Sequence, residues 1–257
     1  MLNTALSALL LLYILASGVW LLSLRKNDVG IVDSVWPVLI LAGAATYAVL
    51  SPQTGPRTVV VLTLVALWAT RLALHITWRH WGEPEDRRYQ AIRARNEPNF
   101  RWKSIVLVFL LQATLAWIVS WSVLAAVANT QPWQWLDWVG ACIVIAGALF
   151  EAVADWQLVA FKSDAAHKGQ VMDRGLWRNS RHPNYFGESC VWWGFYLIAL
   201  SSHSWWTIAS PMLMTVLLLR VSGVALQEKD IAERRPGYRD YIARTNAFFP
   251  GRRRQKH

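Results

Sequence analysis

The chain has 257 residues, of which 54% are hydrophobic and only 16% are charged, and its mean hydropathy is +0.25. A soluble domain of this length needs more charged residues to cover its surface, so the composition favours a membrane protein over a soluble globular one. The net charge of +10 does not require a nucleic-acid partner, because basic loops that face anionic lipid headgroups produce the same excess.

The apolar residues come in blocks. A helix needs roughly 20 mostly apolar residues to cross a hydrocarbon core of about 30 Å, and backbone amides cannot stay unpaired in lipid. We therefore expect an all-α integral membrane bundle of about seven transmembrane helices. The predicted spans are 2–24, 29–50, 58–78, 104–128, 136–160, 186–201 and 205–227. The first is expected to be retained rather than cleaved as a signal peptide, since Arg25 and Lys26 follow it instead of preceding it.

Basic residues predict the orientation of the bundle. They gather after the first, third, fifth and seventh predicted spans, whereas the intervening loops hold only Arg57. The positive-inside rule then places the N-terminus outside and the C-terminus in the cytoplasm. The loop at 79–103 mixes basic and acidic residues, which predicts a folded, salt-bridged loop.

Carboxylates within or beside the spans are candidate functional groups, because ionisable residues in a membrane are costly and face a cavity or a partner. They are Asp33, Glu151, Asp155, Glu188 and Glu228. Glu151 and Asp155 lie four residues apart and so share one helix face. The alternative is that each carboxylate only pairs with an arginine to lock the bundle; candidate partners are Arg71, Arg79, Arg181 and Arg220.

The segment 173–188 is the richest in polar side chains. Gly175 favours a turn, and Pro183 suits the first turn of the helix that follows. The polar residues around that turn are Arg178, Arg181, His182, Asn184 and Tyr185, with Glu188 one turn beyond Asn184. A helix N-terminus beside arginines favours phosphate or carboxylate binding. The alternative is an interfacial anchor that touches lipid phosphates.

The C-terminal stretch predicts a short polar helix. Tyr238, Tyr241 and Arg244 share one of its faces, which either covers the site or makes the helix an amphipathic interfacial one. No metal site is expected, because His75 and His80 lack nearby cysteines or a closed set of ligands.

These motifs carry a resemblance. Arg-His-Pro-Asn-Tyr-Phe-Gly-Glu at 181–188, preceded by Gly-Leu-Trp at 175–177, resembles the C-terminal region of the steroid 5-alpha-reductase family. Within that group it looks closest to a bacterial branch known mainly as a domain of unknown function. The likeness covers roughly 150–250 and includes Asp155 with Gln157, and more weakly it extends to His75. The same core resembles membrane methyltransferases of isoprenylcysteine or phospholipid headgroups, which carry a later Glu like Glu228.

The resemblance implies a bound NADPH within a single membrane domain. Residues 1–128 are then expected to face lipid and substrate, and residues 129–257 to hold the cofactor. Matched or neighbouring positions imply these cofactor-binding residues: Asp155, Lys162, Arg178, Arg181, His182, Asn184, Tyr185, Glu188, Glu228, Tyr238, Tyr241 and Arg244.

The catalytic residues of the family are matched less directly in this sequence. In the steroid enzymes a Glu on the second helix and a Tyr on the third hold the carbonyl oxygen of the substrate. Here the second span offers Asp33, and the Tyr position is Ile76 when His75 is matched. Asp33 and His75 are the predicted catalytic residues, since either can donate a hydrogen bond when protonated.

Three functions follow as hypotheses. The first is an NADPH-dependent reductase of an activated C=C bond in a lipophilic, steroid- or isoprenoid-like substrate, in a bacterial inner membrane with its site toward the cytoplasm. The second is a methyltransferase in which S-adenosylmethionine is held by Arg181, His182, Tyr185 and Glu228. The third is a non-catalytic lipid-binding membrane protein. The expected partners are the substrate and membrane lipids.

Overall fold

The computed structural model describes residues 1–221, 223–224, 228, 231, 235 and 237–254. Every regular element among them is helical, so the predicted all-α class is confirmed, and these residues form no strand. The chain divides into two compact units. The first comprises Met1–Gln134 and Ala199–Ala209, and the second comprises Trp135–Ile198 and Ser210–His257.

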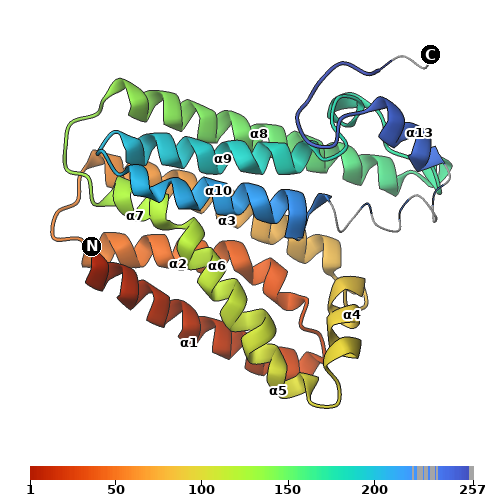
Figure 1. The fold of residues 1–257 in the computed structure, drawn as a ribbon, viewed down its shortest axis with the longest axis horizontal. Helices are drawn as coiled ribbons and strands as arrows, with labels where there is room; N and C mark the ends of the chain where they lie inside the picture. Colours follow the sequence, from red (N-terminus) through yellow and green to blue (C-terminus); the bar gives the residue numbers. More distant parts are fainter. Residues whose placement is uncertain (222, 225–227, 229–230, 232–234, 236, 255–257) are drawn as a thin grey trace. The chain divides into compact units, whose positions relative to one another are not determined.

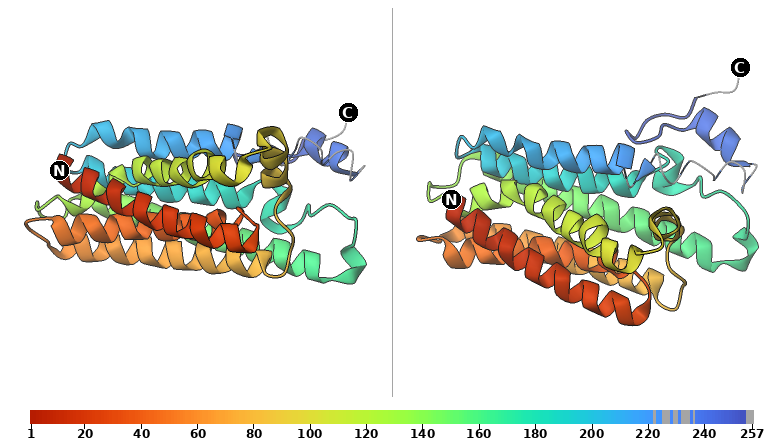
Figure 2. Two further views of the ribbon diagram at one scale, coloured as in Figure 1. Left: turned by 90° about the horizontal axis from the view of Figure 1, so that it is seen from below. Right: turned by 60° about the horizontal axis from the view of Figure 1, so that its bottom comes forward.

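The first unit is built on three long helices that pack side by side, with α2 touching both α1 and α3 (Figures 1 and 2). A broken helical run from α5 to α7, which includes the π-helical segment η1, then packs on α1 and α2. The elements of the first unit are α1 (Leu2–Lys26), α2 (Ile31–Leu50), α3 (Pro56–His80), α4 (Arg87–Asn96), α5 (Phe100–Ser104), η1 (Ile105–Leu110), α6 (Leu111–Val119), α7 (Trp121–Val127) and η4 (Trp205–Ile208).

The second unit is a group of long helices with a folded polar end. Thr215 of α10 accepts a hydrogen bond from the Trp193 indole and shares another with Ser189, which fixes α10 against α9. The elements are α8 (Trp135–Ser163), η2 (Ala165–His167), η3 (Gly175–Arg178), α9 (Pro183–Leu200), α10 (Ala209–Val216), η5 (Leu217–Val221) and α13 (Gly237–Arg244).

Five helical runs are long and apolar enough to cross a membrane, and they indicate an integral membrane protein. They are Leu2–Lys26, Ile31–Leu50, Pro56–His80, Phe100–Val119 and Trp135–Ser163. The sixth predicted span falls on α9, which begins three residues earlier than expected, at Pro183. The seventh falls on the shorter apolar run Trp205–Val221, and its predicted end at 225–227 lies outside the described residues. The number of spans and their orientation stay predictions.

Arg57 is the basic residue in the loops that are otherwise free of basic residues, and its contacts give it a structural role. Its side chain is buried at the start of α3, where it donates to the carbonyl oxygens of Asn129 (3.1 Å), Gln131 (2.7 Å) and Pro132 (3.0 Å). A guanidinium that satisfies several carbonyls ties the loop after α7 to α3.

The loop at 79–103 is folded and salt-bridged, as predicted. Asp86 caps α4 by accepting a hydrogen bond from the backbone N–H of Arg88 at 2.8 Å. Arg93 forms a two-point ion pair with Glu85, at 3.1 Å and 2.8 Å. The loop therefore contains a capped helix fastened by its own charges.

Two pairs of facing glycines bring α8 and α9 into close contact. A Cβ atom added to Gly147 would lie 2.7 Å from the carbonyl oxygen of Gly187, and one added to Gly140 would lie 2.7 Å from that of Gly194. The two glycines on each helix are seven residues apart, which is two turns along one face. Small residues at such an interface let two backbones approach more closely than any side chain allows.

Gly147→Ala should therefore destabilise the protein. The added methyl group cannot fit without separating the helices, and overpacking of this kind costs roughly 1–3 kcal/mol. Gly18→Ala is the matched control, because a Cβ at Gly18 on α1 meets nothing within 4 Å. Thermal unfolding in detergent should show a lower midpoint for the first variant and an equal or higher one for the control. Equal midpoints for Gly147→Ala and wild type would show that the glycine contact is dispensable.

Candidate functional site

The contact between α8 and α9 places Asp155 beside Asn184. The side-chain Nδ2 of Asn184 donates to Asp155 Oδ1 at 3.1 Å, and Asp155 is only 5% exposed. The side-chain oxygen of Asn184, Oδ1, is buried and accepts no hydrogen bond from any residue that the structure describes. Buried acceptors of this kind are normally satisfied, so this atom marks a place where a ligand N–H or O–H can bind.

Two further carboxylates lie on the same helices near this pair. Glu151 precedes Asp155 by about one turn of α8, and Glu188 follows Asn184 by one turn of α9. Glu151 is 2% exposed and Glu188 is 8% exposed. The carboxylates on α8 and α9 are thus buried rather than solvated, and their functional role stays a prediction.

The loop after α8 folds back onto that helix through Gly175. Gly175 has a φ of 54°, and a Cβ there would lie 2.5 Å from Gln157 Oε1. The same Gln157 oxygen accepts a hydrogen bond from the backbone N–H of Leu176 at 2.9 Å. The indole of Trp177 then donates to the carbonyl oxygen of Ala154 at 2.9 Å. Glycine is needed because the turn is left-handed and the glutamine amide leaves no room for a side chain.

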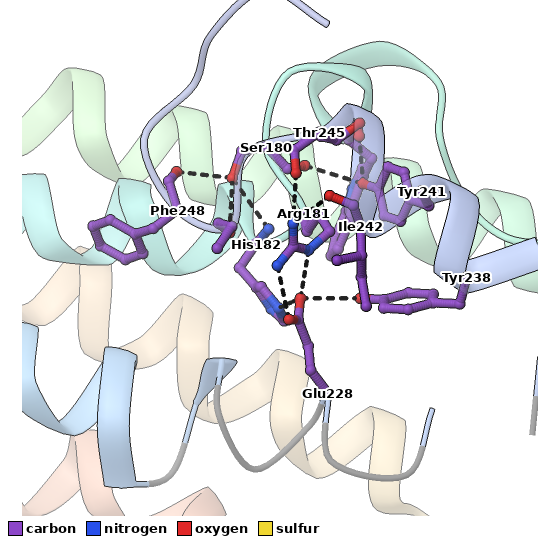
Figure 3. A network of polar contacts seen from close by, with 11 residues as sticks. Ser180, Arg181, His182, Glu228, Tyr238, Tyr241, Ile242, Thr245 and Phe248 are labelled. Atoms are coloured by element: carbon purple, nitrogen blue, oxygen red, sulfur yellow. Dashed lines mark hydrogen bonds and ion pairs between the residues drawn. The ribbon is translucent and has the colours of Figure 1, made fainter. Parts of the chain in front are cut away.

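Glu228 lies at the centre of a charged network (Figure 3). Arg181 makes a two-point ion pair with it, from Nε at 2.6 Å and from Nη2 at 2.8 Å. The ring Nε2 of His182 lies 3.0 Å from Glu228 Oε1, and the hydroxyl of Tyr238 donates to the same oxygen at 3.4 Å. The network therefore joins four of the residues predicted to bind a cofactor.

Arg181 also holds the C-terminal segment. Its Nη1 donates to the carbonyl oxygens of Ile242 at 3.3 Å and Thr245 at 2.5 Å, and its backbone N–H donates to Asn246 at 2.9 Å. A guanidinium has five N–H groups. In Arg181, two of them donate to the carbonyl oxygens of Ile242 and Thr245 and two donate to Glu228, so four are used among the described residues. Arg181 is thus mainly a structural residue, with one N–H group left to bind a ligand.

The same segment fastens the loop before α9 at several more points. Tyr241 donates its hydroxyl to the carbonyl oxygens of Trp177 and Ser180. Ser180 in turn donates its hydroxyl to the carbonyl oxygen of Phe248 at 2.8 Å. The predicted helix at the C-terminus forms as α13, and it buries both Tyr238 and Tyr241. The tyrosine face of this helix packs on the loop before α9. Its two predicted roles, covering the site and lying at the membrane interface, stay predictions.

The remaining predicted cofactor-binding residues lie around this network. Tyr185 stacks on His182 with ring centroids 5.4 Å apart. Arg244 lies 4.0 Å from Asp173, which also accepts a 2.7 Å hydrogen bond from Arg253. Lys162, in the last turn of α8, and Arg178, at the end of η3, are exposed. All twelve predicted cofactor-binding residues therefore belong to the second unit.

The charges of the network set the ionisation of Glu228. Burial alone raises the pKa of this carboxyl, but hydrogen bonds from His182 and Arg181 outweigh burial and lower the pKa to about 2, from an ordinary value of 4.5. Burial, and then the charge of Glu228, raise the pKa of Tyr238. At neutral pH the network therefore contains an ionised Glu228 and a protonated Tyr238.

Glu228→Gln should make stability less dependent on acid pH. A carboxyl whose pKa is lowered on folding contributes stability that is present above pH 4.5 and is lost as pH falls toward 2. At pH 7 we expect the variant to be less stable by roughly 1–3 kcal/mol, the cost of a lost charged hydrogen bond. The gap between the unfolding midpoints of wild type and variant should narrow between about pH 4.5 and 2.

Asp164→Asn is the control for this experiment. The Asp164 side chain is 52% exposed, and asparagine can still cap η2, so its effect should stay within about 0.5 kcal/mol. A gap between wild type and Glu228→Gln that is constant with pH would contradict the assigned role of Glu228.

In the first unit, Asp33 is held by two residues of α4. The hydroxyl of Tyr89 donates to Asp33 Oδ1 at 2.5 Å, and Arg88 Nη2 donates to Oδ2 at 2.7 Å. Burial, and then the charge of Asp33, raise the pKa of Tyr89 well above its usual range, so its hydroxyl stays protonated. His75, the other predicted catalytic residue, is half-buried on α3.

Sequence reasoning missed Arg88 and Tyr89 as partners of Asp33. The available signal was Asp86, whose position just before Arg88 is typical of a helix cap. That signal predicts a helix in the loop, but it does not say which side chain of the helix turns toward α2. In the structure Tyr89 is the side chain that turns toward α2: it is 5% exposed, and its partner Asp33 lies in the first turn of α2.

The fold and the site together define a helical integral membrane protein with a buried polar site on two antiparallel helices. The chain belongs to the family described as "Protein of unknown function (DUF1295)", whose model matches residues 19–245. It is similar to the uncharacterized protein C594.04c of Schizosaccharomyces pombe, with 26% identity over 279 residues, 96% of this chain and 80% of the relative. No solved structure matches this chain.

Proposed function

We propose that the protein is an NADPH-dependent membrane reductase that transfers a hydride to an activated C=C bond of a lipophilic, steroid- or isoprenoid-like substrate. The observation that carries the proposal is the pair Asp155–Asn184, with the buried acceptor Asn184 Oδ1 beside it. The resemblance to the steroid 5-alpha-reductase family supports the same reaction class. We place the protein in a bacterial inner membrane, with seven spans and the site toward the cytoplasm.

The chemistry of these side chains fits part of a nicotinamide cofactor. The carboxylate of Asp155 and the amide oxygen of Asn184 are acceptors, which suit the hydroxyls of a ribose or the NH₂ group of a carboxamide. Lys162 and Arg178 are exposed cations of the same unit, and such side chains bind phosphates. Bound NADPH would supply the hydride, and these residues would bind and orient it.

Arg181 and Glu228 have a different part in this proposal. Their ion pair, at 2.6 Å and 2.8 Å, fixes the loop that leads into α9 and the segment that covers it. They are therefore positioning residues, which hold Asn184 at the start of α9, rather than the main phosphate ligands.

Reduction of an enone also requires a proton donor that polarises the carbonyl oxygen. We keep the two predicted candidates, Asp33 and His75, for this role. Tyr89 is not a third candidate, because it donates its single hydroxyl proton to Asp33 at 2.5 Å.

NADPH should raise the unfolding temperature of the detergent-purified protein. A cofactor at about 100 times its dissociation constant stabilises the folded state by about 2.7 kcal/mol. Asn184→Ala should lose this shift, because it removes the acceptor and the partner of Asp155. Ser189→Ala should keep it, since Ser189 lies on the same helix but bonds Thr215 at 3.2 Å. No shift in wild type, or one that Asn184→Ala leaves intact, would overturn the assigned cofactor site.

A methyltransferase is the second candidate, and the network of Figure 3 is the observation that favours it. Arg181 and His182 each lie within hydrogen-bonding distance of Glu228, and these residues would hold the amine and carboxylate of S-adenosylmethionine. The same thermal measurement with S-adenosylmethionine separates the candidates. A shift with that cofactor alone, lost in Glu228→Gln, would replace the reductase; no shift with either would favour non-catalytic lipid binding.

A further inference from the structure

A polar cavity of about 280 Å³ opens in the first unit, where α1 ends and α5 begins. It is lined by side chains of three helices, among them Leu24, Arg93, Arg101 and Ser104. The indole of Trp20 donates to Ser104 Oγ at 3.2 Å and to the carbonyl oxygen of Arg101 at 3.3 Å. These bonds fix α1 against α5 beside the cavity, so its wall is a built part of the unit.

Two cations line the cavity, and they differ in their partners. Arg93 makes a two-point ion pair with Glu85, and its guanidinium lies 4.8 Å from the ring centroid of Phe100. Asp28 and Glu97 also act on Arg93, at longer range. Arg101, in contrast, is exposed, lies 5.9 Å from the ring centroid of Trp102, and forms no ion pair with any carboxylate of the described residues. Arg101 is therefore the lining cation that can bind an anion.

Aromatic and apolar side chains locate the cavity at a membrane–water interface. The rings of Trp20 and Trp102 lie 5.7 Å apart, and Trp102 is 62% exposed beside Arg101. Tryptophan is enriched at headgroup depth. Toward the membrane interior, α1 exposes Leu21 and η1 exposes Val106, as helices do when they face acyl chains.

We propose that this cavity binds the phosphate group of an anionic phospholipid headgroup, with Arg101 as its main charged ligand. A guanidinium binds phosphate through two parallel hydrogen bonds, and the apolar faces of α1 and η1 would contact the acyl chains. The site lies in the first unit and involves none of the residues assigned to the cofactor, so it stands independently of the proposed reductase.

The test compares lipids on the full-length, delipidated protein by native mass spectrometry. Phosphatidylglycerol is the anionic probe and phosphatidylcholine, which has no net charge, is the comparison. Arg101→Gln should weaken phosphatidylglycerol binding by tenfold or more. Arg25→Gln is the matched control, because Arg25 is an exposed basic residue at the end of α1 that does not line the cavity. General attraction of one surface cation to anionic lipid changes the binding constant by only about fivefold.

A second variant tests the cavity without changing charge. Leu24→Trp should fill the cavity and weaken phosphatidylglycerol binding as much as Arg101→Gln does, and the unfolding midpoint of each variant reports whether it still folds. Inorganic phosphate forms a separate arm, read by thermal shift. Phosphate binding without lipid binding would overturn the lipid assignment. Equal binding of the two lipids, or equal losses in Arg101→Gln and Arg25→Gln, would overturn the site itself.

Discussion

The backbones of α8 and α9 touch at Gly140 with Gly194 and at Gly147 with Gly187, and the arrangement of the second unit depends on that contact. Because the helices are antiparallel and the glycines recur every second turn, only one register brings both pairs together. In that register the residues two turns beyond Gly147 on α8 meet the first turn of α9, and Asp155 bonds Asn184. The polar site is thus a consequence of helix packing in an apolar environment, where close approach rather than hydrophobic burial holds helices together.

Polar groups at the end of these helices serve either structure or binding, and the hydrogen bonds distinguish the two. Arg181 gives most of its donors to Glu228 and to carbonyl oxygens of the C-terminal segment. Asn184, the second residue of α9, keeps a buried acceptor that no described residue uses. Nearby residues of the same motif can therefore have different roles, since a guanidinium that has used most of its donors positions the loop while an unsatisfied amide oxygen can receive a ligand.

Much of the fold could be predicted from the sequence because hydropathy reports directly on lipid contact. The five apolar helices overlap the first five expected spans, and the acids expected on α8 and α9 are buried. Arg181 was among the arginines expected to pair with a carboxylate, and it pairs with Glu228. Its carbonyl partners could not be predicted, since every residue type supplies a backbone carbonyl. Tyr89 was missed because it lies in a short polar helix whose orientation depends on Asp33. The pairing of the glycines was equally hidden, because spacing along one helix does not identify the facing residues.

The fastening of the loop before α9 has a consequence for biosynthesis. Its partners, from Tyr241 to Arg253, are synthesised after α9 and α10, whereas the loop itself precedes α9. While α9 and α10 are being inserted, Ser180 and Arg181 lack the carbonyl groups that they bond in the finished protein. Closure of this end of the second unit must therefore wait until the residues beyond α10 have been made, and a chain truncated before Tyr241 would leave the entrance to α9 unformed.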